Sequence, residues 1–332
     1  MHPVPTRRRR TREEMLADLK RLKEILTAES GAAVVGAFDT ALDSELLAAD
    51  RAPEQKFETP LPDVEQLRAI QPNSGVAGWY REELQDMTRR MATDLQRKLK
   101  RCYEPAKNRL ALDTVDIALD DDPVVVLRRT MAVWGRLWQK RFDDLSKLIA
   151  ASFAGRTQRY TDAALRRRMR EAGFTVRFRP TERQVSAYRA VVAENVNLIR
   201  SIPQQFLKDV RSAVWTSVMR GGSMSELSDS IRKKYGITYR RAAFIARDQV
   251  AKSKSVMENA RRAELGITEA VWQHSGAGKE PRPTHVRMNG KRYKLAEGMY
   301  DAAEQQYVQP GELPNCRCTS RAVIPARLTA GR

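Results

Sequence analysis

Reactive side chains gather in one short stretch near the end of the sequence. His274 and His285, two of only three histidines, lie there with Cys316 and Cys318, two of only three cysteines. Two imidazoles and two thiolates would complete a tetrahedral ligand set for zinc. The cysteines are separated by a single residue, fewer than the roughly two to four that usually separate paired zinc ligands. These four residues are the candidate zinc ligands of the sequence.

Two other interpretations of this stretch stay open. The two cysteines would point to the same side of a strand and pack inside a small core, with His285 capping a turn or bonding to backbone. Alternatively, a cysteine and His285 would form the thiolate–imidazolium pair of a Cys-His hydrolase, with Arg317 lowering the thiol pKa. No glycine-rich turn that could form an oxyanion hole directly precedes either cysteine. We therefore expect a protein that is not an enzyme.

Positive charge is concentrated in the second half of the 332-residue chain, whose formal net charge is +19. Residues 1–150 contain 26 Lys and Arg against 25 Asp and Glu, whereas residues 151–332 contain 34 against 16. Such a field attracts polyanions, and no base-reading motif is present. We expect sequence-nonspecific binding to double-stranded DNA. The candidate DNA-binding residues are Arg166, Arg167, Arg168, Arg170, Arg177 and Arg179.

Several classes of protein are disfavoured by composition. No stretch approaches the ~18 apolar residues of a membrane span, and the basic start is not followed by the apolar segment of a secretory signal. Three cysteines are too few for a disulfide framework. We expect synthesis in the cytoplasm and no membrane span. The run Asp120-Asp121-Asp122 before Pro123 is typical of a helix start rather than of a divalent-metal site.

The candidate residues must be positioned by a mostly helical chain, because apolar side chains recur at helical spacing through most of it. In the first half, this spacing predicts helices over 12–29, 33–49, 78–99 and 123–149, with a linker at 50–63. In the second half we expect a basic helix over 161–172 and a helix from Thr181 that Pro203 interrupts. We also expect a helix end at Gly221-Gly222, a short helix from Ser223 to Tyr235-Gly236, and a longer one from Thr238 to Gly266.

Short strands are expected mainly after Gly266. Alternation of apolar and basic residues predicts one earlier strand over 174–180. The later strands are expected at 269–274, 285–294 and 315–324, with turns at Asn289-Gly290 and Pro310-Gly311. Trp272 would anchor the core of this part.

The predicted fold is mainly α, with an elongated helical body and a small α+β C-terminal module. We divide the chain into a near-neutral helical region at 1–150, a basic helical region at 151–265, and the Trp/His/Cys module at 266–327.

A series of short motifs over about residues 180–325 resembles a known family. Each piece is short, but their order is specific. They are Asn195–Pro203, the Gly221-Gly222 turn, Arg241–Gln249, Gly266-Ile267, Trp272, Arg282-Pro283-Thr284-His285, Gly290, Pro310-Gly311 and Cys316-Arg317-Cys318. Together they resemble the phage Mu F-like minor head proteins, the phage head morphogenesis family.

The resemblance implies a structural protein of the phage head. It would reside in the virion after synthesis in the host bacterial cytoplasm, and would associate with the portal protein, with capsid or scaffold proteins and with packaged DNA. Its role would lie in head assembly or in DNA packaging and delivery. The alternative is a zinc-stabilised nucleic-acid-binding module unrelated to phage heads, and the third hypothesis is the Cys-His hydrolase.

Overall fold

The structure is a computed structural model that describes residues 66–111, 123–276 and 280–325. The predicted helices at 12–29 and 33–49, the linker at 50–63 and the Asp120-Asp121-Asp122 run lie outside these residues.

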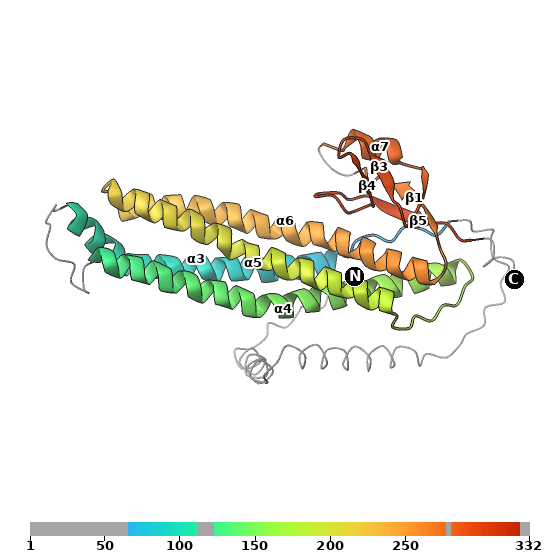
Figure 1. Ribbon diagram of the computed structural model, residues 1–332, viewed down its shortest axis with the longest axis horizontal. Coiled ribbons are helices and arrows are strands. Elements are labelled where there is room, and N and C mark those ends of the chain that lie inside the picture. The colour runs from blue at the N-terminus through green and yellow to red at the C-terminus, as the bar shows by residue number, and fades with distance from the viewer. Residues whose placement is uncertain (1–65, 112–122, 277–279, 326–332) are drawn as a thin grey trace, which may run out of the picture. The chain divides into compact units, whose positions relative to one another are not determined.

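Four long helices form the main body of the described chain (Figure 1). They are α3 (Ser74–Ala111), α4 (Pro123–Glu171), α5 (Glu182–Met219) and α6 (Met224–Glu264). Each helix packs against the next one in sequence, and α6 packs back against α3. Successive helices run in opposite directions, so the arrangement is an up-down-up-down bundle.

The core of the bundle contains several large aromatic side chains. Trp134, Trp138 and Phe142 of α4 lie in it with Phe206 of α5, and the Trp134 and Phe206 rings meet edge to face. Burial of each such side chain stabilises the fold by about 1.5–3 kcal/mol. The aromatic residues of α4 therefore hold the helices of the bundle together.

A buried polar chain crosses the same core. The Tyr80 hydroxyl donates to Asn195 Oδ1 at 2.8 Å, and Asn195 Nδ2 donates to Gln249 Oε1 at 3.1 Å. Gln249 Nε2 in turn donates to Glu194. Because buried polar groups are costly when unpaired, this series of hydrogen bonds specifies how α3, α5 and α6 align.

The helices are fewer and longer than predicted. The expected separate helices over 123–149 and 161–172 are one helix, α4, which also crosses the boundary drawn at residue 150. The predicted interruption at Pro203 was wrong, because this residue is buried inside α5. The predicted break near Tyr235-Gly236 was also wrong, since α6 continues through it. The predicted helix starts at Thr181 and Ser223 are confirmed, and the structure adds that both residues are N-caps. The predicted helix ends at Gly221 and Gly266 are also confirmed, and both glycines have positive φ.

A small α+β module follows α6, as predicted. Its three-stranded antiparallel sheet has the order β2-β1-β5, and two further strands pair as a hairpin. One short helix packs among them. The elements are β1 (Glu269–Gln273), α7 (Pro283–Met288), β2 (Arg292–Lys294), β3 (Met299–Asp301), β4 (Gln306–Val308) and β5 (Thr319–Ala322).

Two strand predictions need correction. Residues 174–180 pair with no other strand and form an extended connection between α4 and α5. Their alternation arises because Phe174, Val176 and Phe178 pack on the module core while the residues between them are exposed. Residues 285–288 are helical, since Pro283 starts α7. Asn289-Gly290 is accordingly the end of this helix rather than a hairpin turn.

The fold class was predicted correctly as mainly α with a small α+β module. Among the described residues, no helix combines the length and the apolar character needed to span a membrane.

Candidate metal centre and basic surface

His285 stands at the centre of the candidate site. It lies on α7 and is 2% exposed. Its Nδ1 atom is 3.5 Å from Cys316 Sγ and 3.7 Å from Cys318 Sγ. On the other side of the ring, Nε2 lies 3.1 Å from Asp301 Oδ2. The edge of the ring also packs against Trp272, with the centroids 5.1 Å apart.

The two cysteines precede β5 in a loop whose backbone is tightly constrained. The predicted Pro310-Gly311 turn is present, and Gly311 has φ +85°. The Gly311 N–H donates to Cys316 Sγ at 3.3 Å. Asn315, directly before Cys316, has φ +61°, which asparagine tolerates better than most residues. The loop thus brings both thiols to His285.

Helix α6 holds this loop in place. Asp248 accepts a hydrogen bond from the Asn315 N–H at 2.8 Å, and Arg247 donates to the Asn315 side chain. A Cβ atom at Gly311 would lie 3.1 Å from the carbonyl oxygen of Ala251. The Arg241–Gln249 motif therefore has a structural role, because it supports the chain before Cys316.

Asp301, at the end of β3, was missed in the sequence. It is fully buried and accepts hydrogen bonds from the Thr284 hydroxyl and the Ala303 N–H. Burial raises the pKa of Asp301, but the bonds from Ala303 and Thr284 and the neighbouring His285 outweigh it, so its pKa falls below the usual value. No local pattern marks Asp301 among the 41 acidic residues.

His274 lies outside this cluster. The described His, Cys, Asp and Glu residues include one group with ligand atoms all within 4.8 Å of one another, formed by His285, Cys316 and Cys318. His274 Nδ1 instead accepts a hydrogen bond from the backbone N–H of Gly276, and the backbone N–H of His274 donates to the Asn289 side chain. The four-residue zinc set predicted from the sequence is therefore reduced to three residues.

The two thiols have different acidities in this site. A hydrogen bond from Cys318 lowers the pKa of Cys316 to about 4; burial opposes this, while bonds with His285 and backbone N–H groups reinforce it. The pKa of Cys318 is raised, first because its thiol bonds to Cys316 and second because of burial. The cluster thus stabilises one thiolate.

A buried ionic network joins the module to the bundle. Arg261 of α6 forms two hydrogen bonds of 2.9 Å to the carboxylate of Asp162 on α4, and a third to the carbonyl of Arg179. Arg262 bonds to Glu258 and donates to the hydroxyl and carbonyl of Ser320 in β5. Since Arg261 and Arg262 are each 1% exposed, they act in folding and not at the surface.

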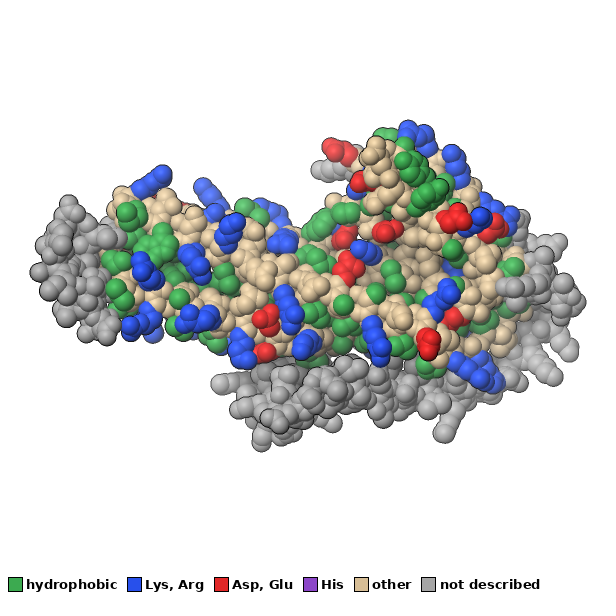
Figure 2. All heavy atoms as spheres, viewed as in Figure 1, with side chains coloured by type: hydrophobic (Ala, Val, Ile, Leu, Met, Phe, Trp, Pro, Cys, Tyr) green, Lys and Arg blue, Asp and Glu red, His purple; other side chains and the backbone are tan. Residues whose placement is uncertain are grey.

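The six arginines proposed for DNA contact lie at the end of α4 and in the extended connection after it. Arg167, Arg170, Arg177 and Arg179 are exposed, whereas Arg166 and Arg168 are half-buried. The Arg166 guanidinium stacks on Phe178 at 5.3 Å, and Arg168 pairs with Glu171 at 2.8 Å. Figure 2 shows further Lys and Arg side chains along the visible helices and around the module, with fewer acidic ones between them.

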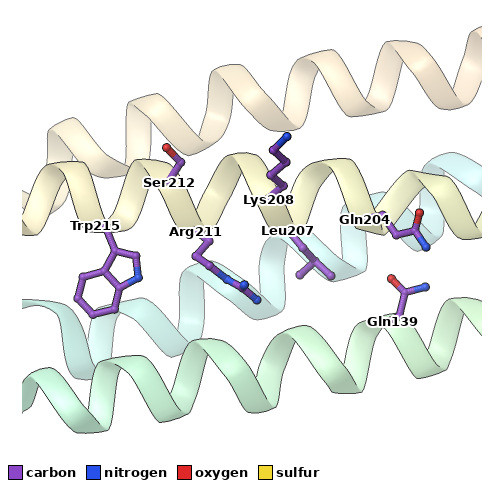
Figure 3. A pocket seen from close by; sticks show the side chains of 7 residues that line it. All are labelled: Gln139, Gln204, Leu207, Lys208, Arg211, Ser212 and Trp215. Atoms are coloured by element: carbon purple, nitrogen blue, oxygen red, sulfur yellow. The ribbon is translucent and has the colours of Figure 1, made fainter.

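An open groove of about 490 Å³ lies on the bundle, away from these arginines in sequence (Figure 3). Gln139 of α4 and six residues of α5, Trp215 and Arg211 among them, line it. The lining contains no histidine, cysteine or carboxylate, and its ionisable side chains are Lys208 and Arg211.

Comparison with known proteins agrees with the resemblance seen in the sequence. Residues 208–321 match the family described as Phage Mu protein F like protein.

Over these residues the chain is similar to the Mu F-like family.

The Mu F-like region runs from the second half of α5 to β5 and contains His285, Asp301, Cys316 and Cys318. An uncharacterized protein of Haemophilus influenzae is 25% identical to the chain over 249 residues, which are 74% of this chain and 53% of that protein. The chain thus spans about half the length of this relative. No solved structure matches the chain.

Proposed function

We propose that this protein is a minor structural component of a phage head that acts in head morphogenesis. The observation that carries the proposal is the Mu F-like region at residues 208–321. It resides in the virion after synthesis in the cytoplasm of the host bacterium. Its partners are the portal protein, capsid or scaffold proteins, and packaged double-stranded DNA.

The exposed charge supports the DNA part of the proposal. Residues 151–332 carry 34 basic against 16 acidic residues, but burial of Lys254, Arg261 and Arg262 removes these three from the surface. Arg167, Arg170, Arg177 and Arg179 stay exposed on a continuous stretch of chain. Guanidinium groups bind phosphate oxygens without regard to base sequence. This stretch therefore suits sequence-nonspecific binding to packaged DNA.

The division of the chain supports separate roles for its parts. Residues 1–150 are nearly neutral, with 26 basic and 25 acidic residues, and we assign them to docking on the portal and other head proteins. Residues 151–265 supply the DNA-contacting end of α4 and the connection after it, and residues 266–327 contain the module, whose core packs against the end of α4. We assign no catalytic role, because both thiols of the module are only 5% exposed.

The test is whether the protein enters heads together with the portal. Particles are assembled from the genes that surround this chain's gene, with and without the portal gene, and are purified on density gradients. Quantitative mass spectrometry is expected to find a few copies per particle when the portal is present and a large loss when it is absent. Absence from both kinds of particle would reject the head assignment.

The DNA part is separable in the same particles. DNA-filled and empty heads are compared after mild disruption at low and high salt. The protein is expected to sediment with released DNA at low salt and to leave it at high salt, because phosphate contacts are salt-dependent. Retention on the portal with no DNA association at any salt would leave the head role intact and reject the DNA role.

A further inference from the structure

We propose that His285, Cys316 and Cys318 bind one zinc ion that ties α7 to the chain before β5. Neither the family match nor the head role assigns a metal to this chain. The three ligand atoms come from two segments, α7 and the chain before β5, and all three residues are buried. Thiolate and imidazole together favour zinc over magnesium or calcium, which prefer oxygen ligands.

The distances fit a tetrahedral ion. With Zn–S of about 2.3 Å and Zn–N of about 2.0–2.1 Å, a tetrahedral angle separates sulfur and nitrogen by about 3.6 Å. The observed separations from His285 Nδ1 are 3.5 Å to Cys316 Sγ and 3.7 Å to Cys318 Sγ. All three atoms lie within 4.8 Å of one another, so one ion can contact them at once.

Hydrogen bonding alone explains the convergence of these three side chains less well than a bound cation does. A neutral imidazole nitrogen carries either one proton or one lone pair, so His285 Nδ1 forms one good hydrogen bond at most. Two sulfur atoms nevertheless converge on it. A cation between the three atoms satisfies both sulfurs and the nitrogen lone pair together.

The surroundings of His285 set it up as a ligand. Asp301, fully buried, lies 3.1 Å from Nε2 and is held by Thr284 and Ala303. A carboxylate at this position accepts a hydrogen bond from Nε2–H and so favours the tautomer whose Nδ1 lone pair faces the cysteines, the arrangement usual behind zinc-binding histidines. The Gly311 N–H, which points at Cys316 Sγ, further stabilises a thiolate there.

A metal ion would add stability that the small module otherwise has little means to obtain. Three of its five strands, β2, β3 and β4, contain three residues each. Elements this short bury little apolar surface, and small folds often add a metal for stability. The described protein residues supply three ligands, so water completes the tetrahedron in our proposal.

Metal content of the full-length protein tests the proposal. The protein is purified with a reductant and without chelator, then analysed by mass spectrometry for metals. We expect about one zinc per chain. Replacement by Co²⁺ should give the intense thiolate-to-cobalt absorption and the d–d bands of a tetrahedral site, a signature that packing of free thiols cannot produce.

Matched variants locate the ion. Cys316→Ser and Cys318→Ser should each lose zinc, whereas Cys102→Ser, at a buried cysteine of α3, should retain it. His274→Ala should also retain it, because this histidine lies outside the cluster. If the Cys316 or Cys318 variant fails to fold, Asp301→Asn still tests the site, with a zinc affinity lowered by about 10–100-fold in competition with a chelator.

Three outcomes would overturn the proposal. The folded, reduced protein could contain no zinc and take up none from added Zn²⁺. Zinc could survive both cysteine replacements. Finally, the purified protein could hold a Cys316–Cys318 disulfide, or a thiol that alkylates rapidly with no change on adding Zn²⁺, and these results would favour a redox or nucleophilic pair instead.

Discussion

Individual arginines in the basic half do two different jobs. Arg261 and Arg262 are buried and paired with Asp162, Glu264, Glu258 and Ser320. Arg167 and Arg170 are exposed on the last turns of α4. The sequence shows the same residue type in both places, and only the structure separates them. The formal net charge therefore overstates the positive charge on the surface that a polyanion can contact.

The Arg261–Asp162 pair should be the most sensitive ionic contact. Asp162→Asn leaves a buried guanidinium partly unpaired, and we expect the free energy of unfolding to fall by about 3–5 kcal/mol. Urea denaturation followed by circular dichroism measures this. The control is Asp229→Asn, which breaks an exposed pair with Arg232 on the same helix α6. Equal midpoints for the two variants would show that Arg261 is not buried as described.

Gly311 should tolerate alanine less well than Gly290. Both have positive φ, +85° and +78°, so both replacements incur about 1–2 kcal/mol of left-handed strain. At Gly311 a Cβ would also approach the Ala251 carbonyl at 3.1 Å, whereas at Gly290 it meets nothing within 4 Å. Thermal unfolding should therefore show the larger loss for Gly311→Ala. A larger loss of stability in Gly290→Ala than in Gly311→Ala would contradict the close packing of this loop against α6.

The candidate site was only partly predictable from residues. His285, Cys316 and Cys318 stood out because histidine and cysteine are rare in the chain. Asp301 did not, since one carboxylate among many has no local signature and its contacts to His285 and Thr284 are long-range. His274 was included because it is rare too, yet its ring is used in a local turn.

At the scale of elements, the main finding is the continuity of the helices. Pro203 and Gly236 suggested ends, because proline in a helix interior costs about 3 kcal/mol and glycine about 1 kcal/mol. Next to Pro203, however, Ile199, Ile202 and Phe206 are completely buried. Each such burial contributes about 1.5–3 kcal/mol, so packing in the bundle outweighs local propensity. Sequence patterns predicted well which segments are helical, but they predicted the helix ends correctly only where a capping residue was present.

The start of α6 depends on such a cap. The Ser223 hydroxyl accepts the N–H of Glu226, whose carboxylate accepts the N–H of Ser223. Ser223→Ala should lower the free energy of unfolding by about 1 kcal/mol. Ser225→Ala, two residues further in the first turn, removes the same hydroxyl without touching the cap and should have little effect. Chemical denaturation of both variants checks this, and an unchanged Ser223→Ala would refute the capping box.

In the whole molecule, charge is divided along the chain but the fold is not. The near-neutral first half contributes α3 and most of α4 to the bundle, while the basic half contributes α5, α6 and the module. The two halves share one hydrophobic core. The charge asymmetry was plain in the sequence, but the sharing of the core was not, because it depends on contacts between distant helices.

We propose that the exposed arginines after residue 151 bind DNA through its phosphates. The most direct measurement is the affinity of the full chain for unrelated double-stranded DNA sequences across a range of salt concentrations. Replacing Arg167, Arg170, Arg177 and Arg179 by Gln is compared with the same charge change at Arg97, Lys100, Arg101 and Arg136, which are exposed in the near-neutral half. We expect a steep log–log salt slope that falls by about 0.9 for each contacting arginine removed. We also expect equal affinity for every DNA sequence and little change in the control variant. A flat slope, or an equal loss of affinity in both variants, would show that these arginines do not bind the phosphates.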